Sequence, residues 1–188
     1  MTEIWLVRHG QTDWNVDERW QGHSDIPLNA AGLEQARQLA EKLAGQQFDA
    51  LYSSDLQRAT QTAEVIGASL GLPYQTDPRL REIHLGQWEG MLESDVRQQF
   101  STAWYERQQD PLNAHAPGGE TLPEVAARLV QVFNDIASTH PAGKVLVVSH
   151  GLALRSMLCL AHRIPLGNAY NEPWDNATWQ VIRWPIDD

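Results

Sequence analysis

The sequence predicts a single α/β domain built as a three-layer sandwich, in which helices cover both faces of a mostly parallel central sheet. Two continuous apolar runs, at 4–7 and 145–148, have the pattern of strands buried on both faces. Segments with helical spacing of apolar residues alternate with the predicted strands, as in parallel sheets joined by crossover helices. The chain has 188 residues and no internal repeat, low-complexity tract or linker. We therefore expect one well-buried domain over residues 1–188.

The first half of the chain contains two predicted strand–helix units. The apolar run at 4–7 is the first strand, and Asn29 is placed to cap a helix after an intervening polar loop. Residues 49–52 form a second short strand. The polar residues Ser-Ser-Asp at 53–55 can cap the next helix, which Gly-Leu-Pro at 71–73 ends. The order strand, helix, strand, helix fits two successive crossover units.

The second half begins with an irregular segment. Residues 78–120 carry only a thin apolar pattern, which predicts short helical pieces in a surface excursion. Its cap-like part is expected at about 83–120. Thr121 is then placed to cap a helix that ends before His140. Residues 144–149 are the clearest buried strand, and a helix follows them directly. Residues 178–184 alternate like a last strand at an edge of the sheet.

The charge balance argues against several kinds of partner. The chain has 14 Lys and Arg residues against 24 Asp and Glu residues, a formal net charge of −10 at pH 7. Such a chain repels nucleic acid and anionic lipid surfaces, so we expect neither as a partner. Its single cysteine, Cys159, excludes an intrachain disulfide and is expected in the core. Without a long apolar run or a recognisable secretion signal, the sequence predicts a cytoplasmic protein.

Two of the best predicted strands end in the same way. Arg8-His9-Gly10 follows the first strand, and Ser149-His150-Gly151 follows the strand at 144–149. Ligands of open α/β sheets bind at the carboxyl ends of the strands, and a glycine there lets a ligand approach the backbone closely. One such pair would most simply end a strand, but two at matching positions favour a shared binding site.

Arginine residues add positive charge at the same edge. Arg8 precedes His9, and Arg58 lies in the first turn of the helix after the second strand, where unpaired N–H groups attract anions. Guanidinium groups bind phosphate oxygens with two parallel hydrogen bonds. Although Arg58 alone could be a solvated helix residue, the four cationic or imidazole side chains together predict a cradle for a phosphoryl group.

Cleavage of a phosphate ester also needs a proton donor. Glu82 is the candidate, because the neighbouring apolar residues Leu80, Ile83 and Leu85 could bury it and favour its protonated form. Glu89 lies in the same segment and is the alternative. For either residue, an ordinary surface carboxylate is the simpler interpretation of the sequence alone.

At this point the motifs resemble those of a known family. They follow one another in order along nearly the whole chain: Leu6-Val7-Arg8-His9-Gly10-Gln11-Thr12, Gln21-Gly22, Pro27-Leu28-Asn29, Ser53-Ser54-Asp55-Leu56, Arg58-Ala59, Leu80, Glu82, Trp88-Glu89-Gly90, Pro117-Gly118-Gly119-Glu120 and Ser149-His150-Gly151. This series is similar to that of the histidine phosphatase superfamily, in its phosphoglycerate mutase-like branch. The resemblance implies a phosphoglycerate mutase-like fold.

The resemblance also implies a role for each matching residue. His9 would be the nucleophile that forms a phosphohistidine, and Glu82 would protonate the leaving oxygen and then activate water. The residues that would hold the phosphoryl group are Arg8, Arg58, His150 and Asn15. Those that would line the substrate pocket are Gln21, Gly22, Gly151 and His84. The family needs no metal and no other cofactor, and its substrates are small phosphorylated metabolites.

Several alternatives stay open at this stage. A phosphoglycerate mutase would need cations for the substrate carboxylate, and the candidates Arg97 and Arg107 are matched by acidic neighbours, so the short chain favours a phosphatase. A catalytically inactive phosphate-binding protein is disfavoured because both His9 and Glu82 are present. A metal-dependent phosphatase is weaker still, because the histidines are scattered. An edge strand or C-terminal helix offers a surface for a homodimer.

Four tryptophans, Trp14, Trp20, Trp88 and Trp104, could line the leaving-group pocket, although each taken singly fits the core equally well. The sequence does not identify the metabolite, because relatives with this core act on phosphoserine, phosphoglycerate derivatives, sugar phosphates or α-ribazole phosphate.

Overall fold

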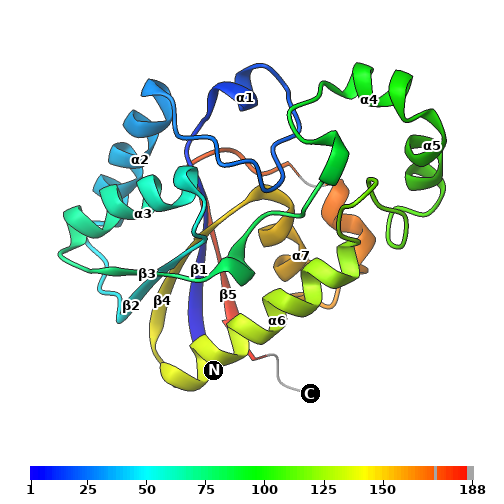
Figure 1. The fold of residues 1–188 in the computed structure, drawn as a ribbon. Coiled ribbons are helices and arrows are strands. Elements are labelled where there is room, and N and C mark those ends of the chain that lie inside the picture. Colours follow the sequence, from blue (N-terminus) through cyan, green and yellow to red (C-terminus); the bar gives the residue numbers. More distant parts are fainter. Residues whose placement is uncertain (172, 186–188) are drawn as a thin grey trace.

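The computed structural model describes residues 1–171 and 173–185 and contains one five-stranded sheet (Figure 1). The strand order is β3-β2-β4-β1-β5. The strands are β1 (Thr2–Arg8), β2 (Ala50–Ser53), β3 (Tyr74–Thr76), β4 (Lys144–Ser149) and β5 (Trp179–Trp184). All neighbours pair in parallel except β5, which is antiparallel to β1 at the edge of the sheet. The predicted mostly parallel α/β class is therefore confirmed.

Helices cover both faces of this sheet (Figure 1). On one face lie α2 (Ala30–Leu43) and α3 (Gln57–Leu70), and on the other lie α6 (Leu122–Thr139) and α7 (Gly151–Ala161). Successive side chains of β4 point to opposite faces, so that Leu146 and Val148 pack with α2 and α3 while Val145 and Val147 pack with α6 and α7. This double burial explains why the strand reads as an unbroken apolar run.

The ends of the helices mostly follow the predicted capping residues. Asn29 caps α2, its side chain accepting from the backbone N–H of Gly32 at 2.8 Å, and Thr121 forms a capping box with Glu124 at the start of α6. Gly71 ends α3 in the left-handed conformation, with φ +66°.

The start of α3 differs from the prediction. The N-cap is Leu56, which has no side chain that can cap, and not one of the polar residues at 53–55. Ser54 instead forms a hydrogen bond with the ring of His150, and Asp55 forms an ion pair with Arg81 at 2.6 Å. The polar residues at this position are therefore used by tertiary contacts rather than by the helix.

Several short elements were not predicted, because they are too short to show a period. They are α1 (Asp13–Val16), β3 and the 3₁₀ turn η3 (Leu166–Tyr170), whereas the 3₁₀ turns η1 (Pro78–Leu80) and η2 (Gly86–Trp88) lie in the segment where short helical pieces were expected. All three residues of β3 are exposed, which removes the apolar alternation that marks a strand. The excursion contains η2, α4 (Glu93–Gln99) and α5 (Ser101–Gln109), which lie beyond one end of the sheet in Figure 1.

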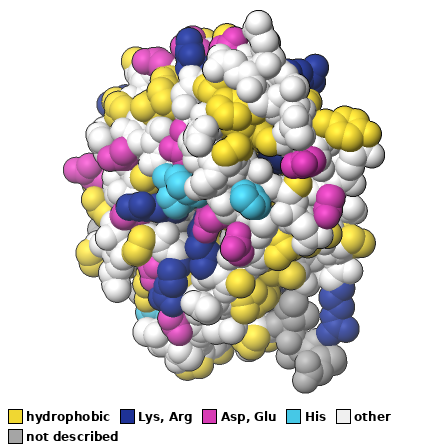
Figure 2. All heavy atoms as spheres, turned by 45° about the vertical axis from the view of Figure 1, so that its right-hand side comes forward, with side chains coloured by type: hydrophobic (Ala, Val, Ile, Leu, Met, Phe, Trp, Pro, Cys, Tyr) yellow, Lys and Arg dark blue, Asp and Glu magenta, His cyan; other side chains and the backbone are white. Residues whose placement is uncertain are grey.

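Two further predictions concern the core and the membrane. Cys159 is 5% exposed and packs in the core between α6, α7 and the sheet, as expected. None of the helices formed by the described residues has both the length and the apolar character that a bilayer-spanning segment requires. On the face drawn in Figure 2, acidic and basic side chains are interspersed.

Candidate active site

The two predicted histidines lie side by side at the carboxyl ends of β1 and β4. These strands are parallel neighbours, and Arg8 is paired with Ser149 in the ladder. The residues that follow them, His9 and His150, therefore lie next to each other. The ring centroids of His9 and His150 are 5.1 Å apart, and the two residues are 3% and 0% exposed. Chain segments about 140 residues apart thus meet at one buried point.

The environment of His9 leaves one ring nitrogen available. Its Nδ1 lies 2.7 Å from the carbonyl oxygen of Gly10, and because a carbonyl can only accept, Nδ1 carries the proton and Nε2 has a free lone pair. Burial, together with the charges of Arg58 and Arg8, lowers the pKa of His9 well below 6.5. We therefore expect this imidazole to stay neutral, and so nucleophilic, at pH values below 6.5 as well.

His150 is held in the opposite tautomer. The Nε–H of Arg58 donates to its Nδ1 at 3.1 Å, so the proton sits on Nε2, which donates to the Ser54 hydroxyl oxygen at 2.8 Å. Burial and the nearby Arg58 and His9 lower the pKa of His150 well below 6.5. The ring is thus a neutral donor whose orientation is fixed from two sides.

Arg58 is the most tightly held side chain of the cluster. It is 1% exposed, and its two terminal nitrogens donate to the carbonyl oxygens of Ser24 and Gly22, each at 2.8 Å. Burial lowers the pKa of Arg58 to about 10, so it remains charged at neutral pH. Gly22 has φ +52°, and a Cβ there would lie 2.3 Å from a carboxylate oxygen of Glu89, so a side chain at this turn would strain the backbone and displace Glu89.

Arg8 reaches the same space from β1. Its Nη1 donates to the carbonyl oxygen of Trp174, while its Nε is buried and has no hydrogen-bond partner among the described residues. Burial lowers the pKa of Arg8, and the carboxylate of Glu82 partly opposes that shift. Gly151 lies next to this guanidinium, where a Cβ would be 3.5 Å from Nε. A buried guanidinium N–H without an acceptor fits an oxyanion ligand.

The Glu82 carboxylate lies at the amino end of α7. It accepts from the backbone N–H groups of Leu152 and Ala153, at 3.1 and 3.0 Å, and from that of Ile83 at 3.0 Å. Its immediate surroundings are therefore backbone donors rather than the apolar side chains that the sequence suggested. Glu89, the alternative candidate, instead accepts from the N–H groups of His23 and Leu85 and ties two loops together.

One cavity of about 1160 Å³ connects these groups. Its lining includes Arg8, His9, Arg58 and Glu82, and also three of the residues expected in the pocket, namely Asn15, Gln21 and Gly22. The oxygen of the Gln21 side chain is buried without a hydrogen-bond partner among the described residues. The volume exceeds what a phosphoryl group needs and leaves room for a sizeable leaving group.

Three predicted site residues do not line this cavity. His150 accepts a hydrogen bond from Arg58, and Gly151 lies next to the Arg8 guanidinium. His84 points away from the cavity, because its neighbours Ile83 and Leu85 occupy the cavity side, and its ring packs on His23 at 4.8 Å and pairs with Glu89 at 3.7 Å. The structure therefore does not support His84 as a pocket residue.

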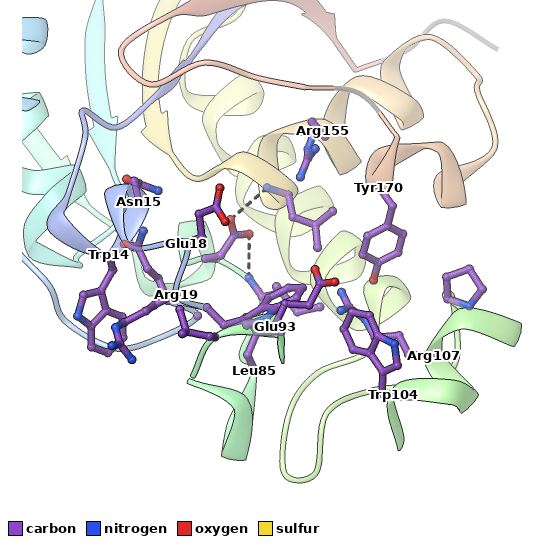
Figure 3. A pocket seen from close by; sticks show the side chains of 18 of the residues that line it. Trp14, Asn15, Glu18, Arg19, Leu85, Glu93, Trp104, Arg107, Arg155 and Tyr170 are labelled. Carbon is purple, nitrogen blue, oxygen red and sulfur yellow. Dashed lines mark hydrogen bonds between the residues drawn. The ribbon is translucent and has the colours of Figure 1, made fainter. Parts of the chain in front are cut away.

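One side of the cavity is aromatic and charged. Figure 3 shows Trp104, Arg107 and Tyr170 on the side opposite Trp14 and Asn15. Arg107 does not pair with its acidic sequence neighbours but packs over the rings of Trp20, Trp88 and Tyr170, 5.0 to 5.5 Å from their centroids. Of the four tryptophans considered, Trp14, Trp20 and Trp104 line the cavity, whereas Trp88 is fully buried in the core.

Sequence reasoning missed Asn176, which lies in the loop before β5. Its side-chain nitrogen donates to the carbonyl oxygens of His9 and Gly10, at 3.0 and 3.3 Å, and to the side-chain oxygen of Asn15 at 3.4 Å. It therefore fixes the backbone that carries His9. Nothing in the periodicity of a polar loop marks such a residue.

The buried histidines predict a loss of stability in mild acid. Because the pKa values of His9 and His150 are lowered in the folded state, the unfolded chain takes up these protons first as the pH falls below 6.5. Each should reduce the free energy of unfolding by up to about 1.4 kcal/mol per pH unit in that range. Urea unfolding at about pH 7.5 and 5.5 measures this, and equal midpoints would contradict it.

Comparison with known proteins places this geometry in a family. The model of branch 1 of the histidine phosphatase superfamily matches residues 4–187. A probable phosphoglycerate mutase of Proteus mirabilis is 35% identical over 201 residues, covering 100% of this chain and 92% of that protein. The match spans both histidine motifs and the segment between them.

Solved structures agree with this match. A mycobacterial glucosyl-3-phosphoglycerate phosphatase, in complex with VO₃, superposes with a TM-score of 0.87 at 31% identity, covering 99% of this chain and 97% of that one. The phosphoserine phosphatase of Entamoeba histolytica has a TM-score of 0.83 at 25% identity, covers 96% and 90%, and has been solved with phosphoserine and with 3-phosphoglyceric acid. These homologues thus bind small phosphorylated metabolites. With its fold, its motifs and its neighbours in agreement, the chain belongs to branch 1 of the histidine phosphatase superfamily and is a phosphatase of that superfamily.

Proposed function

We propose that this chain is a metal-independent phosphomonoesterase that acts on a small phosphorylated metabolite through a phosphohistidine intermediate. The observation that carries the proposal is the placement of His9, which is buried, turns its Nδ1 to the Gly10 carbonyl oxygen so that Nε2 is left free, and lines the same cavity as Arg8, Arg58 and Glu82. The arginines supply the positive charge that a metal ion provides in other phosphatases.

In the first step, His9 Nε2 attacks the phosphorus atom. The new N–P bond forms as the bond from phosphorus to the leaving oxygen breaks, and the protonated carboxyl of Glu82 gives its proton to that oxygen. The guanidinium groups of Arg8 and Arg58 bind the equatorial oxygens, where charge develops. The Nδ1–H bond to the Gly10 carbonyl oxygen stabilises the positive charge that the ring gains.

In the second step, water attacks the phosphohistidine. The Glu82 carboxylate takes a proton from the water, the new P–O bond forms, and the N–P bond breaks to release inorganic phosphate. His9 is then neutral again, and Glu82 is again protonated. Because both displacements occur in line at one phosphorus atom, the same arginines serve both.

The relatives support a range of substrates. Those compared above are named as a probable phosphoglycerate mutase, a glucosyl-3-phosphoglycerate phosphatase and a phosphoserine phosphatase. We propose that residues 83–120 act as a cap that selects the metabolite, because Trp104 and Arg107 of this segment line the leaving-group side of the cavity. A homodimer and a cytoplasmic location stay predictions from the sequence.

Two assays test the proposed function. The purified protein should hydrolyse p-nitrophenyl phosphate at the same rate with and without EDTA, and a rate that depends on added Mg²⁺ or Zn²⁺ would contradict the mechanism. With 3-phosphoglycerate, free phosphate should accumulate faster than 2-phosphoglycerate. The opposite order would make the chain a mutase, and no turnover of any ester would favour an inactive phosphate-binding protein.

A further inference from the structure

The segment that carries Glu82 leaves the short turn η1 and continues as a loop, yet its carbonyl groups all have partners. In the stretch Arg79–Glu82, each of the four successive carbonyl oxygens accepts a hydrogen bond from a side chain. The hydroxyl of Ser149 donates to the carbonyl oxygen of Leu80 at 2.7 Å, and the carbonyl oxygen of Glu82 also accepts from the ring of His23 at 2.8 Å. Side chains thus replace the backbone ladder that a strand or helix would supply.

Arg128 of α6 provides most of these bonds. Its Nη1 donates to the carbonyl oxygens of Arg79 and Arg81, at 2.8 and 2.7 Å, and its Nη2 donates to that of Glu82 at 2.7 Å. Its Nε and Nη2 donate to the two carboxylate oxygens of Glu120, each at 2.9 Å. The five N–H groups of the guanidinium therefore all have acceptors.

This arrangement links the backbone of Glu82 to the place where its carboxylate binds. The carboxylate rests on the first turn of α7, and α7 packs against α6, which carries Arg128. Arg128 itself lines no part of the cavity. It therefore acts on the reaction from outside the cavity, by fixing the backbone from which the Glu82 side chain reaches the site, while its charge also acts on His150.

We propose that Arg128, oriented by Glu120, is a positioning residue that holds Glu82 in line with the leaving oxygen. The proposal rests on the proposed function, in which Glu82 protonates that oxygen. A lysine cannot replace the arginine, because its single ammonium group cannot serve three carbonyls and a carboxylate in one plane.

Comparing two esters whose leaving groups differ in acidity tests whether Glu82 is correctly placed as the acid. An acidic leaving group such as p-nitrophenol departs with little help from a general acid. The alkoxide leaving group of an alkyl ester such as glycerol 3-phosphate must be protonated as it departs. In Arg128→Gln and Arg128→Lys, kcat/KM for glycerol 3-phosphate should fall by about 30-fold or more, and that for p-nitrophenyl phosphate by only about threefold. Competitive inhibition by inorganic phosphate should stay unchanged, because the arginine cradle is intact.

A matched control lies in the same segment. Arg79 forms ion pairs with Asp77 and Asp135, and its side chain has no contact with Glu82. Arg79→Gln removes the same charge and should leave the ratio of the two kcat/KM values unchanged. The thermal midpoint of each variant shows whether it is folded, and the Arg128→Lys variant keeps the charge if Arg128→Gln is unstable.

A double-mutant cycle completes the test. In the Glu82→Gln background, which should already show the selective loss on glycerol 3-phosphate, adding Arg128→Gln should cause no further change in the ratio. Equal losses for both esters in the Arg128 variants would overturn the positioning role while leaving the phosphatase intact. A native protein that hydrolyses neither ester would instead overturn the proposed function itself.

Discussion

Replacing His9 with alanine should abolish turnover of every phosphomonoester, with a loss of kcat of at least about 10⁴-fold. The reason is that His9 Nε2 is the nucleophile of the proposed mechanism, and alanine offers no atom that can form the covalent intermediate. The same variant should lose the acid-labile label that the native protein acquires when it is quenched during turnover of a ³²P-labelled ester. Rapid quench followed by acid and alkali treatment of the labelled protein measures this.

The control for this experiment is another histidine of the same chain. His162 is exposed at the carboxyl end of α7, the opposite end of that helix from His150, and His162→Ala should retain full labelling and turnover. The His9→Ala variant should still bind inorganic phosphate, because Arg8 and Arg58 remain. Labelling that persists in His9→Ala would place the nucleophile at a different residue.

Replacing Arg58 with methionine should damage both the reaction and the fold. Methionine has a similar length but no donors, so the carbonyl groups of Gly22 and Ser24 and the Nδ1 of His150 would all lose their hydrogen bonds inside the protein. We expect the free energy of unfolding to fall by about 3 kcal/mol. The loss of one cationic donor from the developing charge should lower kcat/KM by about 10² to 10³-fold.

Urea unfolding and steady-state kinetics on one preparation separate the two effects. Arg37→Met is the matched control, because Arg37 lies on the exposed face of α2 and pairs with Glu34 at 3.2 Å. It should change stability by less than about 0.5 kcal/mol and leave kcat/KM unchanged. An Arg58→Met protein as stable as the native one would contradict the structural part of this account. Retained activity would contradict its role in the cradle.

The fold was predictable because its strongest signals are periodic. The apolar runs at 4–7 and 145–148 mark strands that are buried on both faces, and the residues after them mark a site at the end of the sheet. The sequence does not state that β1 and β4 are neighbours, so the 5.1 Å approach of His9 to His150 could only be expected from the matching motifs. The structure supplies that adjacency.

The parts that escaped prediction share a physical cause, which is that they are irregular. The side chain of His84 alternates away from the cavity in a loop whose period the sequence does not reveal. Ser54 was expected to cap a helix, because a serine after a strand commonly does so. In the structure its hydroxyl instead bonds the ring of His150, and the sequence does not distinguish these two uses. Asn176 and Tyr170 enter the site from the C-terminal part of the chain, where no pattern links them to His9.

The position of β4 has a consequence for how the molecule is made. In the order β3-β2-β4-β1-β5, β1 and β2 do not touch each other, and β4 joins them although it comes late in the chain. A nascent chain that ends before residue 144 therefore holds only the short β2–β3 pair and the strand β1, whose partners β4 and β5 both come later in the chain. Such unpaired edges are open to misassembly. Both the continuous sheet and the phosphate cradle form only after residues 144–151 have left the ribosome, so catalysis begins only when folding is nearly complete.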